Sequence, residues 1–165
     1  MSETLQQLLC KTVAEVYETM FFTFLKTAEE AGLTPDPGQA VFLEAVIGLS
    51  AREKEVAVHF YYSEALARHI ASNFLGMGPD LLDDRRLRDT LGEAANMTVG
   101  SLLGKLDPQA VCGTLGMPTV CPPTGRTMGD ILGLPDTMAF HSDFGWLLMD
   151  YGAVKACFKH HGSQA

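Results

Sequence analysis

The stretch from residue 82 to residue 107 constrains the fold most, because its side chains separate onto two faces of one long helix. At about 100° per residue, its apolar and small residues form one stripe, as in a helix that packs on a core. This stripe contains Leu87, Leu91, Ala94, Ala95, Thr98, Leu102 and Leu106. The opposite side collects Asp89, Glu93, Asn96, Gly100 and Gly104. The pattern therefore predicts an amphipathic helix with a polar face directed away from the core.

The polar face has an ordered spacing. Glu93, Asn96 and Gly100 follow the i, i+3, i+7 pattern that aligns residues along one side of a helix. An exposed helical glycine costs roughly 1 kcal/mol relative to alanine, so Gly100 and Gly104 require a reason. Close approach by another backbone is one such reason, and a neighbouring helix of the same chain is an alternative.

The first half of the chain reads as a helix, a hairpin and a second helix. Residues 4 to 31 predict a first long helix that ends at Gly32. The prolines of TPDPG, residues 34 to 38, predict a turn. Alternating apolar residues over 40 to 49 and again from Val56 to Tyr62 predict a hairpin with one buried face. A serine cap and a following glycine-rich segment then delimit a shorter helix over 63 to 75.

The last third predicts strands. One strand is expected around residues 118 to 128, and runs at Thr137 to His141 and Trp146 to Tyr151 predict a closing hairpin. The final KHHGSQA is expected to be a frayed tail. This order of elements predicts an α+β fold, with a mostly antiparallel sheet and two long helices packed on one face. With 165 residues, 47% of them hydrophobic, residues 1–165 are expected to form a single domain.

The two long helices hint at an internal repeat. Glu15, Glu18 and Phe22 occupy the same spacing as Glu93, Asn96 and Gly100. If these are two copies of one unit, the first copy has lost the amide and has a phenyl ring where the second has a glycine.

Composition excludes several functions. The net charge is -8 and lysine and arginine are not clustered, so binding to nucleic acid or to an anionic membrane surface is not expected. No apolar run approaches the roughly 20 residues of a membrane span, and the charged N-terminus does not suit a signal peptide, which predicts a cytoplasmic protein. The four cysteines form no C-x-x-C pair. Neither His141 with Asp143 nor His160 with His161 has a third ligand in view, so no metal site is expected.

A carboxylate and an amide one helical turn apart can serve a partner's active site. The carboxylate can pair with a lysine, and the amide can hold a water by donating one hydrogen bond and accepting another. A water held in line with phosphorus is a positioning contribution, and phosphoryl transfer depends mostly on positioning and electrostatics. The alternative is an ordinary solvated helix face, because Glu and Asn are common there.

The string EAANMTVG at 93 to 100 resembles the E-x-x-N signature of the CheC/CheX family of chemotaxis phosphatases. The strings EVYETM at 15 to 20, PTV at 118 to 120 and FHSDFG at 140 to 145 extend the resemblance over most of the chain. It implies that the long helix docks on a phosphorylated CheY-like response regulator, where Asn96 positions the attacking water and Glu93 engages the regulator's lysine. It also implies that Mg²⁺ belongs to the regulator and that this chain binds no cofactor.

The expected partner-binding residues around that pair are Asp89, Gly100 and Gly104 of the polar face, and the resemblance adds Pro118. Pro118 lies one residue short of the family's usual interval from the Asn, and Pro122 and Pro123 are close by. Because Glu18 stands where a first motif would need Asn, the chain is most similar to the single-motif, CheX-like branch, whose members pair as homodimers through a sheet edge.

Two other classes of function remain open. A non-catalytic module of the same fold, binding a response regulator or acting as a flagellar-switch-type adaptor, would hold the partner without changing the rate of phosphate loss. A metal-dependent hydrolase would lose its activity on chelation, with no regulator present.

Overall fold

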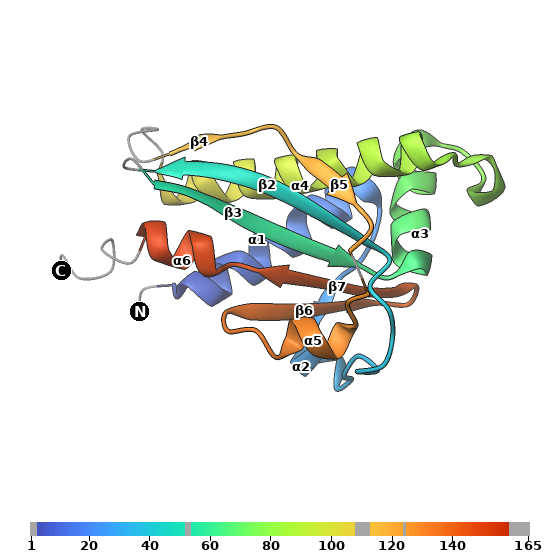
Figure 1. Ribbon diagram of the computed structural model, residues 1–165, viewed down its shortest axis with the longest axis horizontal. Coiled ribbons are helices and arrows are strands. Elements are labelled where there is room, and N and C mark those ends of the chain that lie inside the picture. The colour runs from blue at the N-terminus through green and yellow to red at the C-terminus, as the bar shows by residue number, and fades with distance from the viewer. Residues whose placement is uncertain (1–2, 52–53, 108–112, 124, 159–165) are drawn as a thin grey trace.

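The structure is a computed structural model that describes residues 3–51, 54–107, 113–123 and 125–158 (Figure 1). Its helices are α1 (Leu5–Phe21), α2 (Ala28–Ala31), α3 (Glu64–Leu75), α4 (Asp84–Leu106), α5 (Met128–Leu132) and α6 (Gly152–Phe158), with a 3-10 turn η1 (Pro79–Leu81). Its strands are β1 (Lys26–Thr27), β2 (Leu43–Ala51), β3 (Lys54–Tyr62), β4 (Thr114–Leu115), β5 (Thr119–Cys121), β6 (Thr137–Ser142) and β7 (Gly145–Asp150). The KHHGSQA tail lies outside the described residues.

The strands form one antiparallel sheet in the order β1-β6-β7-β3-β2-β4, and β5 also pairs with β2. Hairpin β2–β3 runs in continuous register from Leu43 opposite Tyr62 to Ala51 opposite Lys54. Because side chains alternate across a strand, Leu43, Ala45 and Ile47 all point to one face, and all three are buried. Both predicted hairpins, β2–β3 and β6–β7, are confirmed.

Helices α1, α3 and α4 cover this face of the sheet and enclose the main core (Figure 1). The large side chains at the centre of this core include Leu9, Tyr17, Phe21, Phe60, Tyr62, Leu66, Ile70, Leu91, Leu102 and Phe140. Helix α5 covers part of the opposite face, where Met128 and Ile131 pack against Tyr61, Trp146 and Leu148. The predicted α+β fold is therefore confirmed, with a second, smaller core that the sequence patterns did not predict.

The prediction of one helix over 4 to 31 is wrong. Helix α1 ends at Phe21, whose buried ring lies 5.1 Å from the ring of Phe74 on α3. The chain then turns at Phe22, with φ of 50°, and passes through β1 into α2. A capping box between Thr27 and Glu30 begins this new helix. Tertiary packing and a local cap thus divide a segment whose periodicity suggested one helix.

Gly32 has φ of 64° and caps α2, so the predicted helix end at this glycine is confirmed. The predicted turn at residues 34 to 38 is also confirmed, because Asp36 accepts hydrogen bonds from the backbone N–H groups of Gly38 and Gln39. Ser63 precedes α3 as expected, yet its hydroxyl makes no capping bond and instead accepts the N–H of Trp146 at 3.0 Å.

The prediction of a strand over 118 to 128 is correct only for β5. Thr127 and Asp130 form a capping box, which starts helix α5 where the strand was expected to continue. Helix α6 was also not predicted. In the internal repeat, Phe22 is a left-handed cap and no longer a helical position, so its correspondence with Gly100 is wrong in detail. No helix of the described segments is both long and apolar enough to cross a membrane.

Candidate functional site

Helix α4 forms where the 82 to 107 pattern predicts it. Asp83 caps its N-terminus by accepting the backbone N–H of Arg86 at 2.7 Å. The predicted core stripe from Leu87 to Leu102 is buried, whereas Leu106 is only partly buried. Packing of this stripe fixes the rotation of the helix, which turns its opposite side outward. We call the outward residues Asp89, Glu93, Asn96, Gly100 and Gly104 the α4 ridge.

Glu93 and Asn96 are partly buried and lie one turn apart on this ridge. Neither side chain makes a hydrogen bond or an ion pair with the described part of the chain. Asp89 is exposed and makes a weak ion pair with Arg85, at 3.8 Å on the helix surface. The structure therefore leaves the carboxylate and the amide available to a partner.

The β4–β5 segment lies along one side of the ridge. A Cβ atom on Gly92 would meet Pro118 Cγ at 3.5 Å, and a Cβ atom on Gly100 would meet Leu115 Cδ1 at 3.6 Å. The segment therefore runs past the turn of α4 that carries Asn96. Pro118, predicted to bind the partner, packs against the flank of α4 while remaining partly exposed.

Helix α1 lies on the other side of α4. Lys105 Nζ donates to Thr12 Oγ1 at 3.1 Å and to Glu15 Oε2 at 2.9 Å. Tyr17, nearer the end of α1, lies close to the side chain of Thr98, nearer the middle of α4. The numbering rises in one helix while it falls in the other, so the two helices run antiparallel.

The same contacts show how the first copy of the repeat, on α1, differs from the second copy on α4. Glu15, which corresponds to Glu93 in the repeat, is bound by Lys105 of this chain, and this hydrogen bond lowers the pKa of the Glu15 carboxyl. Glu18 stands exposed where the second copy has Asn96. Helix α1 thus presents neither a free carboxylate at the first position nor an amide at the second.

The glycines of the ridge are not explained by packing within the described residues. Gly100 faces only a side-chain atom of Leu115, and a Cβ atom on Gly104 would have no atom within 4 Å. Among the described residues, the alternative that a neighbouring helix of this chain packs on these glycines is therefore wrong. Close approach by another backbone stays a prediction.

We expect Gly104→Ala to stabilise the isolated protein by about 0.5 to 1 kcal/mol, because alanine is the better helix former and the added methyl group meets open space. Urea denaturation would measure the change. A destabilised variant would show that Gly104 is needed for folding. If a partner approaches the ridge here, the same variant should also bind that partner more weakly while being more stable.

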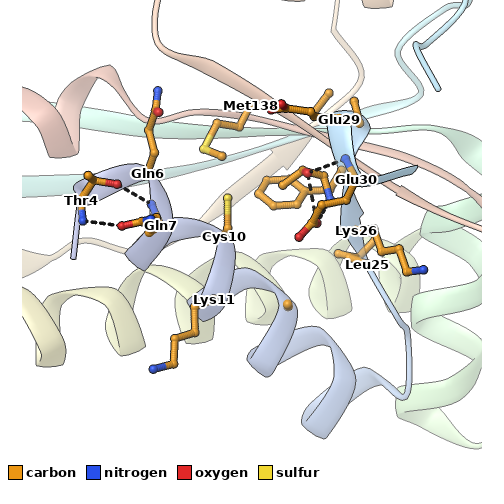
Figure 2. A pocket seen from close by; sticks show the side chains of 15 residues that line it. Thr4, Gln6, Gln7, Cys10, Lys11, Leu25, Lys26, Glu29, Glu30 and Met138 are labelled. Atoms are coloured by element: carbon orange, nitrogen blue, oxygen red, sulfur yellow. Dashed lines mark hydrogen bonds between the residues drawn. The ribbon is translucent and has the colours of Figure 1, made fainter. Parts of the chain in front are cut away.

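A groove of about 890 Å³ lies elsewhere, between the N-terminal half of α1, the β1–α2 segment and β6 (Figure 2). Cys10, Lys11, Glu30 and Met138 are among its lining residues, and no ridge residue reaches it. Burial, with a smaller contribution from Glu30, raises the pKa of the Cys10 thiol, which makes it a poor nucleophile. This groove therefore lies apart from the α4 ridge.

No group of three or more His, Cys, Asp or Glu side chains could hold a metal ion within residues 3–51, 54–107, 113–123 and 125–158. His141 packs against Trp146, with ring centroids 4.6 Å apart. His160 and His161 lie outside the described residues.

The fold and the ridge together define a small α+β protein whose outward-facing helix carries an E-x-x-N pair. The family described as chemotaxis phosphatase CheX matches residues 43–138, which is more than half of the chain and includes Glu93, Asn96 and Pro118. The chain therefore belongs to the CheX family.

Solved structures support the fold. The chemotaxis protein CheX from Vibrio vulnificus has a TM-score of 0.68 at 23% identity, covering 90% of this chain and 94% of its own. A CheC-like superfamily protein from Shewanella has a TM-score of 0.67 at 20% identity, covering 90% and 96%. CheX from Borrelia burgdorferi, solved as a complex with CheY, BeF3 and Mg²⁺, has a TM-score of 0.60 at 13% identity, covering 88% and 95%. No curated protein matches the sequence.

Sequence patterns did not reveal two features that frame the ridge. Met117 is 87% exposed beside Pro118, and its position along α4 depends on the path of the β4–β5 segment. The Lys105 ammonium group binds the Glu15 carboxylate, and these two residues lie 90 positions apart in the sequence. The glycine and the proline on either side of Met117 could have suggested a surface loop. They do not show which helix this loop accompanies.

Proposed function

We propose that this protein accelerates hydrolysis of the aspartyl phosphate on a CheY-like response regulator, with the α4 ridge as its active surface. The observation that carries the proposal is the outward-facing Glu93–Asn96 pair, which has no partner within the described chain. Membership of the CheX family supports the same reaction.

In this proposal, Asn96 orients the attacking water. Its side-chain oxygen accepts a hydrogen bond from the water, and its amide group can donate one to a neighbouring oxygen. The water then stands in line with the phosphorus, and its oxygen displaces the aspartyl carboxylate. The regulator supplies Mg²⁺ for the charge on the phosphoryl group, and this chain supplies the position of the water.

Glu93 anchors the partner through a lysine of the regulator. We expect Glu93→Gln to keep the fold and to lower kcat/KM about tenfold, because an amide replaces the charged acceptor of an intermolecular ion pair. Steady-state hydrolysis at varied regulator concentration would measure the change. An unchanged kcat/KM would show that Glu93 is not part of the site.

Decay of a phosphorylated CheY-like regulator, followed with Mg²⁺ present, tests the function as a whole. Substoichiometric protein should shorten the lifetime of the phosphorylated regulator in repeated turnovers. A non-catalytic binding module would form a complex and leave the decay unchanged. Decay that this protein accelerates only through a metal of its own would point to the hydrolase alternative.

Two further expectations stay predictions. They are the pairing of two copies through a sheet edge and a cytoplasmic location.

A further inference from the structure

A second polar cluster lies on α3, and the proposed function does not use it. His69 and Asn73 stand one turn apart on this helix, and His69 Nε2 lies 3.0 Å from Asn73 Nδ2. The ring of Phe144, in the turn between β6 and β7, stacks on the His69 ring with centroids 3.5 Å apart. We call His69, Asn73 and Phe144 the His69 cluster.

The cluster joins three segments that are far apart in the sequence. Asn73 Nδ2 donates to the carbonyl oxygens of Phe21, at 3.0 Å, and Phe22, at 3.4 Å. Both carbonyls lie at the C-terminus of α1, where a helix leaves its last carbonyls without partners of its own. Phe144 is oriented within its turn, because Ser142 Oγ accepts the Phe144 N–H at 3.1 Å. The cluster therefore connects the end of α1 and the β6–β7 turn to α3.

These contacts determine the protonation state of His69. A carbonyl oxygen can only accept a hydrogen bond, so the amide nitrogen of Asn73, and not its oxygen, faces Phe21. The same nitrogen lies 3.0 Å from His69 Nε2, so Nε2 is the acceptor and carries no proton. The imidazole is therefore neutral, with its proton on Nδ1.

A second proton on His69 disrupts this arrangement. An N–H group at Nε2 would oppose the amide N–H group of Asn73, so two donors would face each other. Turning the Asn73 amide over would offer its oxygen to the imidazolium, but that oxygen would then face the carbonyl of Phe21. Either orientation breaks a hydrogen bond between the side chains of α3 or between α3 and α1, and leaves a polar group without its partner. The intact contact between α1 and α3 therefore requires the neutral imidazole.

The surroundings of His69 do not offset this effect. The charged and titratable side chains closest in sequence to its contacts are Glu18 on α1, Glu64 and Arg68 on α3, and His141 and Asp143 around the β6–β7 turn. None of them makes an ion pair with His69 in the part of the chain that the structure describes, and Arg68 is paired with Glu64 at 3.1 Å. Burial lowers the pKa of the His69 imidazole from its ordinary value of about 6.5.

We propose that the His69 cluster is a pH-sensitive contact, which holds the C-terminus of α1 to α3 at neutral pH and releases it on acidification. This inference is independent of the proposed function. Because folding favours the neutral ring, the contribution of His69 to stability is complete above about pH 6.5 and is lost as the pH falls through that value toward the lowered pKa of His69. The end of α1 then opens locally, before the core unfolds.

NMR of the imidazole nitrogens in the parent protein tests the protonation state directly. At about pH 8, His69 should be the tautomer with its proton on Nδ1, and its titration midpoint should lie below about 6.5. A proton on Nε2 at this pH overturns the proposal, because Nε2 could not then accept from Asn73. A midpoint at or above about 6.5 also overturns it, and would show that the Phe144 ring stabilises the imidazolium.

Amide hydrogen exchange tests the release. The N–H groups of Phe22 and Thr23 both donate to the carbonyl of Tyr17, so their protection factors report on the end of α1. Between about pH 7.5 and about pH 5.5, these factors should fall at least about threefold in the parent. They should stay nearly constant in His69→Gln, whose amide oxygen can accept from Asn73 but takes up no proton in this range.

His59→Gln is the matched control, because His59 lies on β3 and pairs with Glu44 at 2.6 Å. This variant should keep the parental pH dependence at Phe22 and Thr23. An equal pH dependence in His69→Gln would show that another group titrates, and would overturn the proposal. Protection that does not change with pH in the parent would overturn it as well.

Discussion

Replacing Asn96 by alanine is expected to reduce the acceleration of regulator dephosphorylation by a factor on the order of 10² to 10³. That factor is typical for deletion of one group that positions a reactant or stabilises a transition state. Asn96 makes no hydrogen bond with the described chain and stands opposite the buried stripe of α4. Alanine is also the better helix former, so unfolding free energy should stay level or rise by about half a kcal/mol.

Whether the Asn96→Ala substitution changes kcat or KM distinguishes a water-positioning role of Asn96 from a docking role. Loss of a positioned water lowers kcat and leaves the affinity for the BeF3-activated regulator near that of the parent. Asn96→Asp is a useful companion, because it has the same size but replaces the amide N–H donor with a carboxylate, and it should also be inactive. If Asn96→Ala instead raises KM and keeps kcat, Asn96 is a docking residue and the water is held by another group.

Gly145→Ala is expected to cause the largest loss of stability, about 2 to 5 kcal/mol. Gly145 begins β7 with φ of 150°, a conformation that side chains rarely adopt. An added Cβ atom would overlap Ser63 Oγ and approach Leu66 Cβ to 3.4 Å. Ser63 is 1% exposed and cannot retreat without breaking its hydrogen bonds with the backbone of Trp146. The loss of stability from backbone strain therefore adds to the loss from overpacking.

Urea denaturation of Gly145→Ala and of the double variant with Ser63→Ala tests this explanation. Removing the Ser63 hydroxyl takes away the atom that the new methyl group would overlap, so the double variant should be more stable than the sum of the two single losses. Additive losses would show that the overlap is not the cause. Gly104→Ala serves as the comparison glycine, because its added methyl group meets open space.

The hypothesis of an E-x-x-N site could be formed from the sequence because its evidence is local. The spacing of Leu87, Leu91 and Leu102 determines which side of the helix is buried, and Glu93 and Asn96 then face outward by helical geometry alone. The β2–β3 hairpin was predictable for a similar reason, since apolar residues alternate along β2 and from Val56 to Tyr62, although Tyr61 is also buried, on the opposite face under α5.

Other features depended on contacts between distant residues. Periodicity continues past Phe21, yet the helix ends there because that ring packs on Phe74 of α3 and Asn73 Nδ2 donates to the carbonyls of Phe21 and Phe22. The strand expected up to residue 128 stops at Cys121, because Thr127 and Asp130 begin a helix that covers Trp146 on the far side of the sheet. Propensity and pattern are weak priors where such packing competes.

The sequence by itself determined the amphipathic helix α4, the β2–β3 and β6–β7 hairpins and the outward pair Glu93–Asn96, because each depends on the periodicity of a single segment. Only the tertiary structure decided what surrounds that pair. It placed Leu115 and Pro118 along the turns of α4 on either side of Asn96 and bound Glu15 to Lys105. These positions arise from contacts between residues far apart in the chain, which local periodicity does not encode.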